Sequence, residues 1–194
     1  MKIYFLGGSF DPPHIGHLEV AKSCLKYCDK FIFIPSKQTP HKKNPTYFSK
    51  KDRAEMLRLL VGAEKNIEID LFELTSENEI SYSIDTIRHL SKKYPKSNIC
   101  MVLGSDLISN LSSWRNWTEI EQKVGLVCIE RDGYIIKNKL KNIKYITDVN
   151  LYVSSSLIKE FILSKNKDNY LEISKFITKD VYEYIFKKSR MSLC

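Results

Sequence analysis

The sequence predicts an α/β protein built on a doubly wound, mostly parallel β-sheet with helices on both faces. Short apolar runs, which are typical of buried parallel strands, alternate with segments whose apolar residues recur at helical spacing. Hydrophobic residues make up 43% of the 194 residues, which is enough to fill the core of one domain. No change in composition and no internal repeat divides the chain, so residues 1–194 are predicted to form a single domain.

The first predicted unit is a strand, a loop, a helix and a second strand. The apolar run Ile3–Leu6 predicts a buried strand over Lys2–Leu6, and the two glycines after it predict a turn. Apolar residues at helical spacing predict a helix over His17–Tyr27, and a second apolar run predicts a strand over Phe31–Ile34. The next segment, Pro35–Thr46, is polar and holds three prolines, so it is predicted to be a loop.

The same alternation continues through the rest of the chain and supports the parallel sheet. Further strands are predicted over Ile67–Leu71, Ile99–Leu103, Val124–Ile129 and Ile143–Ile146. Further helices are predicted over Lys51–Leu60 and Ser83–Tyr94, and a helical carboxyl-terminal segment over Ser155–Leu163 and Thr178–Phe186. Thr178 is a suitable N-cap for the last of these helices.

The chain is basic, with 31 Lys and Arg residues against 23 Asp and Glu and a net charge of +8. An excess of positive charge attracts anions in general, and it keeps a basic nucleic-acid-binding module open as an alternative to an enzyme. The charge is spread along the chain without a long basic tract, as expected for solvated lysine faces. We therefore expect no nucleic-acid partner.

Two further features bear on where the protein works. No apolar segment approaches the ~20 residues of a membrane span, and no signal peptide is recognisable. The five cysteines form no Cys-x-x-Cys pair, and their odd number argues against a closed disulfide framework. We expect a cytoplasmic protein with reduced thiols and no membrane partner.

A glycine-rich loop follows the first strand and has the features of a phosphate-binding site. In open α/β sheets, ligands bind beyond the carboxyl ends of the strands, where this loop is expected to lie. Adjacent glycines let the backbone approach an anion, and the N-terminus of the next helix attracts negative charge. The loop has neither the Gly-Lys-Ser/Thr ending of a P-loop nor Gly-x-Gly-x-x-Gly, and it consists of Gly7, Gly8, Ser9 and Phe10.

His14 and His17 flank Gly16 directly after this loop. Each imidazole can donate a hydrogen bond to a phosphoryl oxygen and respond to the charge that develops in a transition state. Two alternatives remain open. His14 could cap the helix while His17 is a satisfied buried histidine, or the two could bind zinc with Cys24 and Cys28. The two cysteines fit the apolar face of the predicted helix, which disfavours the zinc site.

Two distant motifs together carry a resemblance to a known superfamily. They are Gly8-Ser9-Phe10-Asp11-Pro12 with His14-x-x-His17, and Val153-Ser154-Ser155-Ser156-Leu157-Ile158-Lys159. The chain resembles the HxGH nucleotidylyltransferases, which carry Ile-Ser-Ser-Thr-x-x-Arg at the second place. The resemblance implies a Rossmann-like nucleotidyltransferase fold and in-line attack on the α-phosphorus of ATP. It implies a catalytic set of His14, His17 and Lys159, and ATP contacts from Gly7, Gly8, Ser9, Phe10, Gly16, Ser154, Ser155 and Ser156.

Within that superfamily the middle of the chain resembles the bacterial nicotinate-nucleotide adenylyltransferases. The motifs are Pro40-His41-Lys42, Asp52-Arg53-x-x-Met56-Leu57, Ser81-Tyr82-Ser83-x-Asp85-Thr86 and Gly104-x-Asp106-x-x-x-x-Leu111-x-x-Trp114-x-x-Trp117. The resemblance implies transfer of an adenylyl group to nicotinate mononucleotide, which gives deamido-NAD. It implies acceptor contacts from His41, Lys42, Ser83 and Trp117, and ATP contacts from Asp106 and Arg131. Without the resemblance, Trp117 would be interpreted as a core residue.

The chain departs from the family pattern at four places. Ser83 and Ser156 replace threonines, Arg131-Asp132-Gly133 replaces an Arg-Pro-Gly turn, and Lys159 replaces an arginine. A lysine lacks the bidentate fork that grips phosphate oxygens. We expect Mg²⁺, bound through the ATP phosphates, to supplement Lys159. The phosphopantetheine adenylyltransferases are the nearest alternative family. The sequence leaves open the choice between nicotinate and nicotinamide mononucleotides, and it allows a homo-oligomer.

Overall fold

The structure, a computed structural model of the chain, describes residues 1–40, 44–130, 142–147, 149, 153–164 and 169–191. Six strands form one sheet in the order β3-β2-β1-β4-β5-β6, and all five pairings are parallel. The strands are β1 (Lys2–Gly8), β2 (Lys30–Pro35), β3 (Ile67–Ile69), β4 (Asn98–Gly104), β5 (Gly125–Ile129) and β6 (Ile143–Ile146). The predicted α/β fold class is confirmed.

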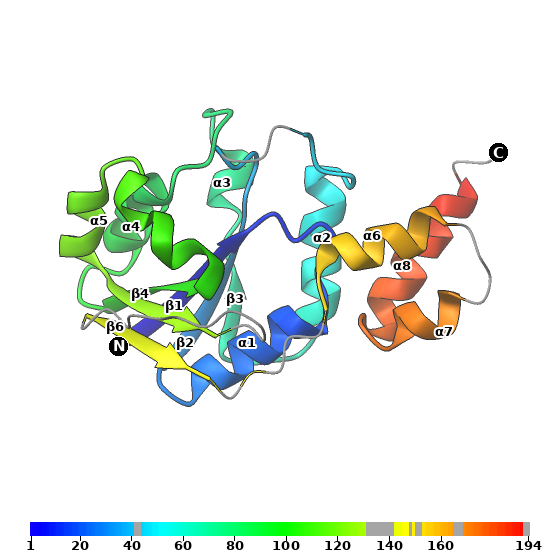
Figure 1. Cartoon of the computed structure of the whole chain (residues 1–194), viewed down its shortest axis with the longest axis horizontal. Coiled ribbons are helices and arrows are strands. Elements are labelled where there is room, and N and C mark those ends of the chain that lie inside the picture. The colour runs from blue at the N-terminus through cyan, green and yellow to red at the C-terminus, as the bar shows by residue number, and fades with distance from the viewer. Residues whose placement is uncertain (41–43, 131–141, 148, 150–152, 165–168, 192–194) are drawn as a thin grey trace.

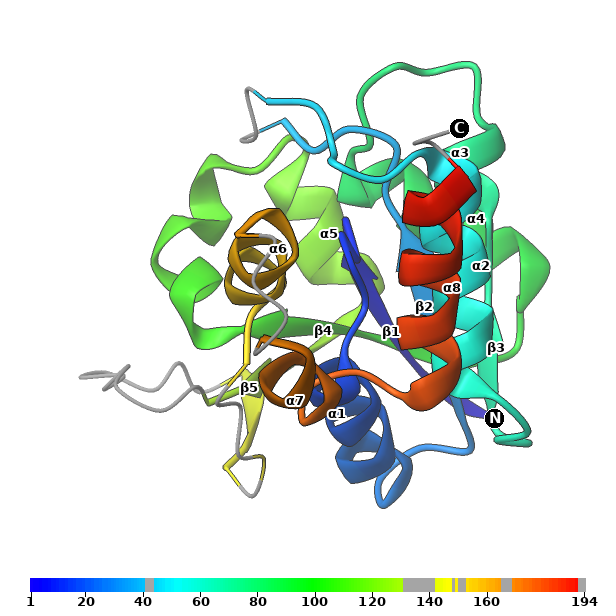
Figure 2. The same ribbon diagram turned by 90° about the vertical axis from the view of Figure 1, so that its right-hand side faces the viewer.

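Helices cover both faces of this sheet, which is why its central strands are apolar along their whole length. One face packs against α1 (Ile15–Leu25), α2 (Lys50–Val61), α6 (Ser155–Leu163), α7 (Asn169–Ser174) and α8 (Lys179–Met191). The other packs against α4 (Ser83–Lys93), the 3₁₀ helix η1 (Ser105–Ser113) and α5 (Trp117–Lys123). Figure 1 shows α4 and α5 on the side away from α2, and α8 lies beside α2 in Figure 2.

Residues on each strand alternate between the two apolar cores. Tyr4, Phe31 and Phe33 belong to the cluster beneath α1 and α2. Ile3 and Ile32, which lie on the same strands, belong to the cluster beneath α4 and α5. The alternation follows from the two-residue period of a strand, and it fixes the rotation of each strand about its own axis.

The order of the strands places the ligand edge of the sheet. The chain winds outward from β1 through β2 to β3, then returns to pair β4 with β1 and winds outward again through β5 to β6. The crevice at such a reversal, beyond the carboxyl ends of the strands, is where α/β proteins bind ligands. Here those ends are Gly7-Gly8 on β1 and Gly104 on β4.

Several short elements were not predicted from the sequence. They are α3 (Phe72–Thr75), η1, α5 and α7, which are too short or too irregular to show helical periodicity. Strand β3 ends at Ile69, two residues earlier than predicted, because the buried carboxylate of Asp70 accepts a hydrogen bond from the backbone N–H of Phe72 and turns the chain into α3. The predicted N-cap is confirmed by the bond from Val181 N–H to Thr178 Oγ1.

None of the helices in the described part of the chain has the length and apolar character needed to cross a membrane.

Candidate active site

The loop after β1 is shaped by a buried aromatic ring. Phe10 has a positive φ of 46° and is only 2% exposed, with its ring against those of Phe33 and His17. A Cβ on Gly8 would lie 3.2 Å from this ring, whereas a Cβ on Gly7 would meet no atom within 4 Å. The core therefore holds the loop from one side and leaves open space at Gly7. Because Phe10 is buried, its ring supports the loop from the core side and is closed to a ligand.

His14 and His17 lie together at the start of α1. His14 is the N-cap, and its backbone N–H donates a hydrogen bond of 3.1 Å to Nδ1 of His17. The two rings stack with their centroids 3.7 Å apart. Since Nδ1 of His17 is the acceptor, a neutral His17 carries its proton on Nε2, where it can be donated to a ligand. The capping interpretation of His14 is therefore correct as local structure, and it is compatible with a role in binding.

The cysteines considered as zinc ligands have a different environment. Cys24 is fully buried in the apolar core, and the thiol of Cys28 donates to the Cys24 carbonyl. Burial raises the pKa of Cys28 to about 11, which disfavours the thiolate that a metal requires. Among the described residues, no cluster of three or more His, Cys, Asp or Glu side chains could hold a metal ion.

The carboxyl-terminal motif contacts Asp11 and Pro12, which directly follow the glycine-rich loop, although about 140 residues separate the two motifs. Ser154 caps α6 by accepting from the N–H of Leu157, and the hydroxyl of Ser155 donates to the Pro12 carbonyl over 2.9 Å. Nζ of Lys159 lies 3.2 Å from Oδ2 of Asp11. The two motifs that were found separately in the sequence therefore form one site at the carboxyl end of β1.

Two buried charged residues support this loop and were not predicted as site residues. Asp11 is 3% exposed and accepts backbone hydrogen bonds from Tyr47 and Phe48. Arg53 is completely buried, and its guanidinium donates to the carbonyl of Ser9. Burial lowers the pKa of Arg53, and the negative charge of Asp11 opposes that shift. Asp11 and Arg53 both occur in the motifs that carry the resemblance, which is the only signal the sequence offers for them.

The predicted acceptor residues Ser83 and Trp117 are the first residues of α4 and α5, and both are half-buried. The two helices are joined by Arg88, whose guanidinium bonds both carboxylate oxygens of Glu119. Trp117 also packs against the core, so the core interpretation of this residue is partly correct.

The polar loop after β2 is attached to the same region. The N–H of Ser81 donates to the Gln38 carbonyl over 2.8 Å, and the N–H of Lys37 donates to Oγ of Ser81 over 3.0 Å. These bonds place the start of the loop that leads to His41 and Lys42 beside the N-terminus of α4.

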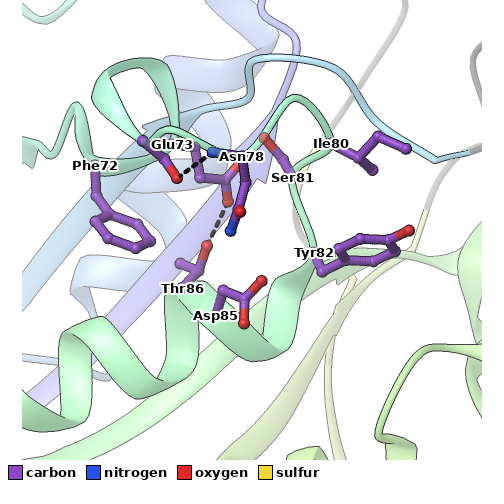
Figure 3. Close-up of a pocket in the computed structure, with 9 residues that line it drawn as sticks. Phe72, Glu73, Asn78, Ile80, Ser81, Tyr82, Asp85 and Thr86 are labelled. Carbon is purple, nitrogen blue, oxygen red and sulfur yellow. Dashed lines mark hydrogen bonds between the residues drawn. The ribbon is translucent and has the colours of Figure 1, made fainter.

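A small surface pocket lies next to Ser81 and encloses about 210 Å³ of empty space, part of it open solvent. Figure 3 shows Glu73, Asp85 and Thr86 grouped in it, while the ring of Tyr82 points away from them. Burial raises the pKa of Glu73, and the hydroxyl of Thr86 donates to its carboxylate. None of the predicted site residues lines this pocket.

Other predicted site residues are only partly placed. Asp106 lies in the first turn of η1, directly beyond the end of β4, and is half-buried. Gly16 is a buried residue in the first turn of α1, and Ser156 is exposed on α6. The remaining predicted residues, His41, Lys42 and Arg131, lie outside the described residues.

Comparison with known proteins agrees with this geometry. A family model described as cytidylyltransferase-like matches residues 5–161. A probable nicotinate-nucleotide adenylyltransferase of Shouchella clausii is 33% identical over 190 residues, covering 97% of this chain and 95% of the relative. The nicotinate-nucleotide adenylyltransferase of Bacillus subtilis is 31% identical over 189 residues, covering 94% of this chain and 98% of the relative. The chain belongs to the nicotinate-nucleotide adenylyltransferase family.

A solved structure of a related enzyme has a similar fold. Plasmodium falciparum nicotinic acid mononucleotide adenylyltransferase, in complex with NaAD, superposes with a TM-score of 0.77 at 26% identity, covering 96% of this chain and 95% of that one. The resemblance in the sequence is thereby confirmed, and so is the nucleotidyltransferase class. Membership of the nicotinate-nucleotide adenylyltransferase family also favours an enzyme over the basic nucleic-acid-binding module.

Proposed function

We propose that this chain transfers the adenylyl group of ATP to nicotinate mononucleotide, giving deamido-NAD and pyrophosphate in the biosynthesis of NAD. Family membership supports this activity, because relatives that match nearly the whole chain are nicotinate-nucleotide adenylyltransferases. The observation that carries it is the packing of the Ser154–Lys159 segment on the histidine loop, through Ser155 with Pro12 and Lys159 with Asp11.

The reaction is a direct displacement at the α-phosphorus of ATP. A phosphate oxygen of the mononucleotide attacks in line, the bond from the α-phosphorus to its bridging oxygen breaks, and pyrophosphate leaves with that oxygen. There is no covalent enzyme intermediate. The task of the protein is therefore to hold the two substrates and to stabilise charge on the phosphoryl oxygens.

The residues around β1 are suited to the triphosphate. The open space at Gly7 admits the phosphates, and the N-terminus of α1 attracts them. His17 donates from Nε2 to a phosphoryl oxygen, and His14 adds a second imidazole 3.7 Å away. Lys159 supplies a positive charge from the opposite motif. Asp106 and Arg131 serve the nucleoside part of ATP.

The acceptor occupies the neighbouring region at the starts of α4 and α5. Trp117 stacks on the pyridine ring, and backbone N–H groups near Ser83 and Trp117 hold its carboxylate. His41 and Lys42 belong to the loop that Ser81 anchors, and Lys42 contacts the phosphate of the mononucleotide.

Mg²⁺ fits this site as an ion that arrives with ATP. Among the described residues no cluster of carboxylates could hold it, and the nearby carboxylate of Asp11 is already engaged by two backbone N–H groups and Lys159. When bound through the phosphates and water, Mg²⁺ would neutralise charge on the triphosphate.

The test is an acceptor panel in which ATP and Mg²⁺ are supplied with nicotinate mononucleotide, nicotinamide mononucleotide or phosphopantetheine. We expect pyrophosphate release and a dinucleotide product with nicotinate mononucleotide. Comparison with the nicotinamide compound measures how strongly the carboxylate is recognised. Pyrophosphate release with phosphopantetheine alone would overturn the proposed acceptor, and release with none of the three would overturn the activity.

A further inference from the structure

Asp11 is the point at which three segments of the site meet. Its Oδ1 accepts from the N–H of Phe48, and its Oδ2 accepts from the N–H of Tyr47 and from Nζ of Lys159. The carboxylate itself is almost completely buried, so its charge is poorly solvated by water. Every partner among the described residues is a donor, so both carboxylate oxygens of Asp11 act as acceptors.

Lys159 has hydrogen-bonding capacity beyond this contact. A lysine ammonium has three N–H donors, and the one bond described here, to Asp11, leaves capacity for others. Its side chain is 28% exposed, against 4% for Asp11, so the ammonium lies at the boundary between the buried carboxylate and the open side of the loop. A lysine without a fixed partner would sample many rotamers, and holding it costs side-chain entropy.

Arg53 is a second cation on the buried side of the same loop. It is fully buried, donates to the Ser9 carbonyl, and feels the charge of Asp11. Its Nε and Nη2 atoms are buried without a hydrogen-bond partner among the described residues. This cation lies on the buried side of the loop and does not depend on the other bonds that Lys159 forms.

We propose that Asp11 is a positioning residue for ATP, which holds the ammonium of Lys159 at the glycine-rich loop so that its other N–H groups point to the triphosphate. The inference rests on the proposed function and deepens it. The bond to Asp11 thereby orients the lysine ammonium, whereas the planar guanidinium of an arginine is oriented by its own geometry. Asp11 remains bonded to Lys159 when ATP is present and does not compete with the nucleotide for it.

A double-mutant cycle on ATP binding tests this. The dissociation constant of a non-hydrolysable ATP analogue would be measured by calorimetry for the wild type, Asp11→Asn, Lys159→Met and the double variant. We expect each single change to weaken binding roughly 10-fold, since hydrogen bonds to charged groups are worth that much. The double variant should bind about as weakly as either single one, because Lys159 acts through its position on Asp11.

The pair formed by Asp70 and Lys93 is a matched control. Asp70 is likewise a buried carboxylate that takes a backbone N–H and a lysine, with Nζ of Lys93 2.9 Å from Oδ2. Asp70→Asn and Lys93→Met should lower thermal stability and leave the affinity for the analogue unchanged. A loss of ATP affinity in these variants equal to that at Asp11 would show a general loss of structure and overturn the proposal.

Two other outcomes would also overturn it. Additive effects in the cycle would mean that Asp11 and Lys159 act separately, and tighter binding by Asp11→Asn would mean that Asp11 competes with ATP. If Asp11→Asn does not fold, a crystal structure of the wild type with the analogue decides. A bond retained from Lys159 to Asp11, with a second to the phosphates, supports the proposal, whereas release of Lys159 from Asp11 contradicts it. Because binding needs no acceptor, these results are independent of which mononucleotide reacts.

Discussion

The backbone N–H of His14 donates to Nδ1 of His17, so the structure fixes which nitrogen of His17 can face a phosphate. The ring is held from two more sides, by the stacked imidazole of His14 and the edge of Phe10. A neutral His17 therefore has its Nε2–H group oriented before any ligand arrives, and preorganised donors of this kind stabilise transition states most effectively.

We expect His17→Ala to lower kcat by about 10²–10³-fold, the usual cost of removing one such donor, while the protein stays folded. Steady-state pyrophosphate release and circular dichroism measure the two properties. His89→Ala is the matched control, because His89 is also held by a hydrogen bond and a stacked ring, from Asp70 and Phe72, but lies on α4. Wild-type turnover in His17→Ala would contradict the proposed mechanism.

Two glycine substitutions compare a position beside open space, Gly7, with a position packed against the core, Gly125. A Cβ on Gly7 meets no protein atom within 4 Å, whereas one on Gly125 would lie 2.8 Å from Sγ of Cys100. Gly7→Ala should keep or slightly raise thermal stability and raise the KM for ATP. Gly125→Ala should lower stability by about 1–3 kcal/mol through overpacking and leave the KM for ATP near the wild-type value. An unchanged KM in Gly7→Ala would mean that the triphosphate does not occupy this space.

Restoring the family residue at position 159 should strengthen the ATP site. An arginine can keep one bond to Asp11 and present a fork to the phosphates, so Lys159→Arg should lower the KM for ATP a few-fold. Lys175→Arg is the control, because Lys175 is an exposed lysine paired with Glu172 on α7. If both variants have the wild-type KM, Lys159 does not contact the triphosphate.

Glu73 should make stability fall as the pH rises. Burial raises its pKa, so the folded state prefers the protonated acid and loses stability as the pH rises from the unfolded pKa through the folded one. Glu73→Gln keeps an acceptor for the Thr86 hydroxyl and removes the ionisation. We expect this variant to have a Tm a few degrees higher at pH 8 and a smaller advantage at pH 4. The exposed Glu183 offers a control through Glu183→Gln. An equal gain at both pH values would show that ionisation is not the cause.

The sheet could be predicted from the sequence because its inner strands β1, β2, β4 and β5 contain apolar runs that are buried on both faces. The sequence predicted a doubly wound, mostly parallel sheet but not which strands are neighbours, because pairing between distant strands has no local signal. The helices η1 and α5 were missed for a related reason, since a 3₁₀ helix and a seven-residue helix show no sustained period. Trp117 was found as a residue, but its place at the start of a helix was not.

The site was predictable where side-chain identity carries the chemistry. His14 and His17 could be proposed from their spacing around Gly16, and Lys159 only from its place in the family motif. The partners of Asp11 could not, because the N–H groups of Tyr47 and Phe48 belong to the backbone and any residue could supply them. The role of Arg53 was hidden for another reason, as it lies among charged residues on a polar helix and nothing local marks it as completely buried.

Ser155 and Pro12 are in contact in the folded protein, but Ser155 is synthesised long after Pro12. In the described part of the chain the last strand of the sheet ends at Ile146, so all six described strands have been made before the residues of α6 are added. A nascent chain can thus possess the histidine loop and the strand that carries it while still lacking Lys159. Under the proposed function, the complete ATP site would form only after α6 has been made, and a product truncated before α6 would carry the histidine loop without Lys159.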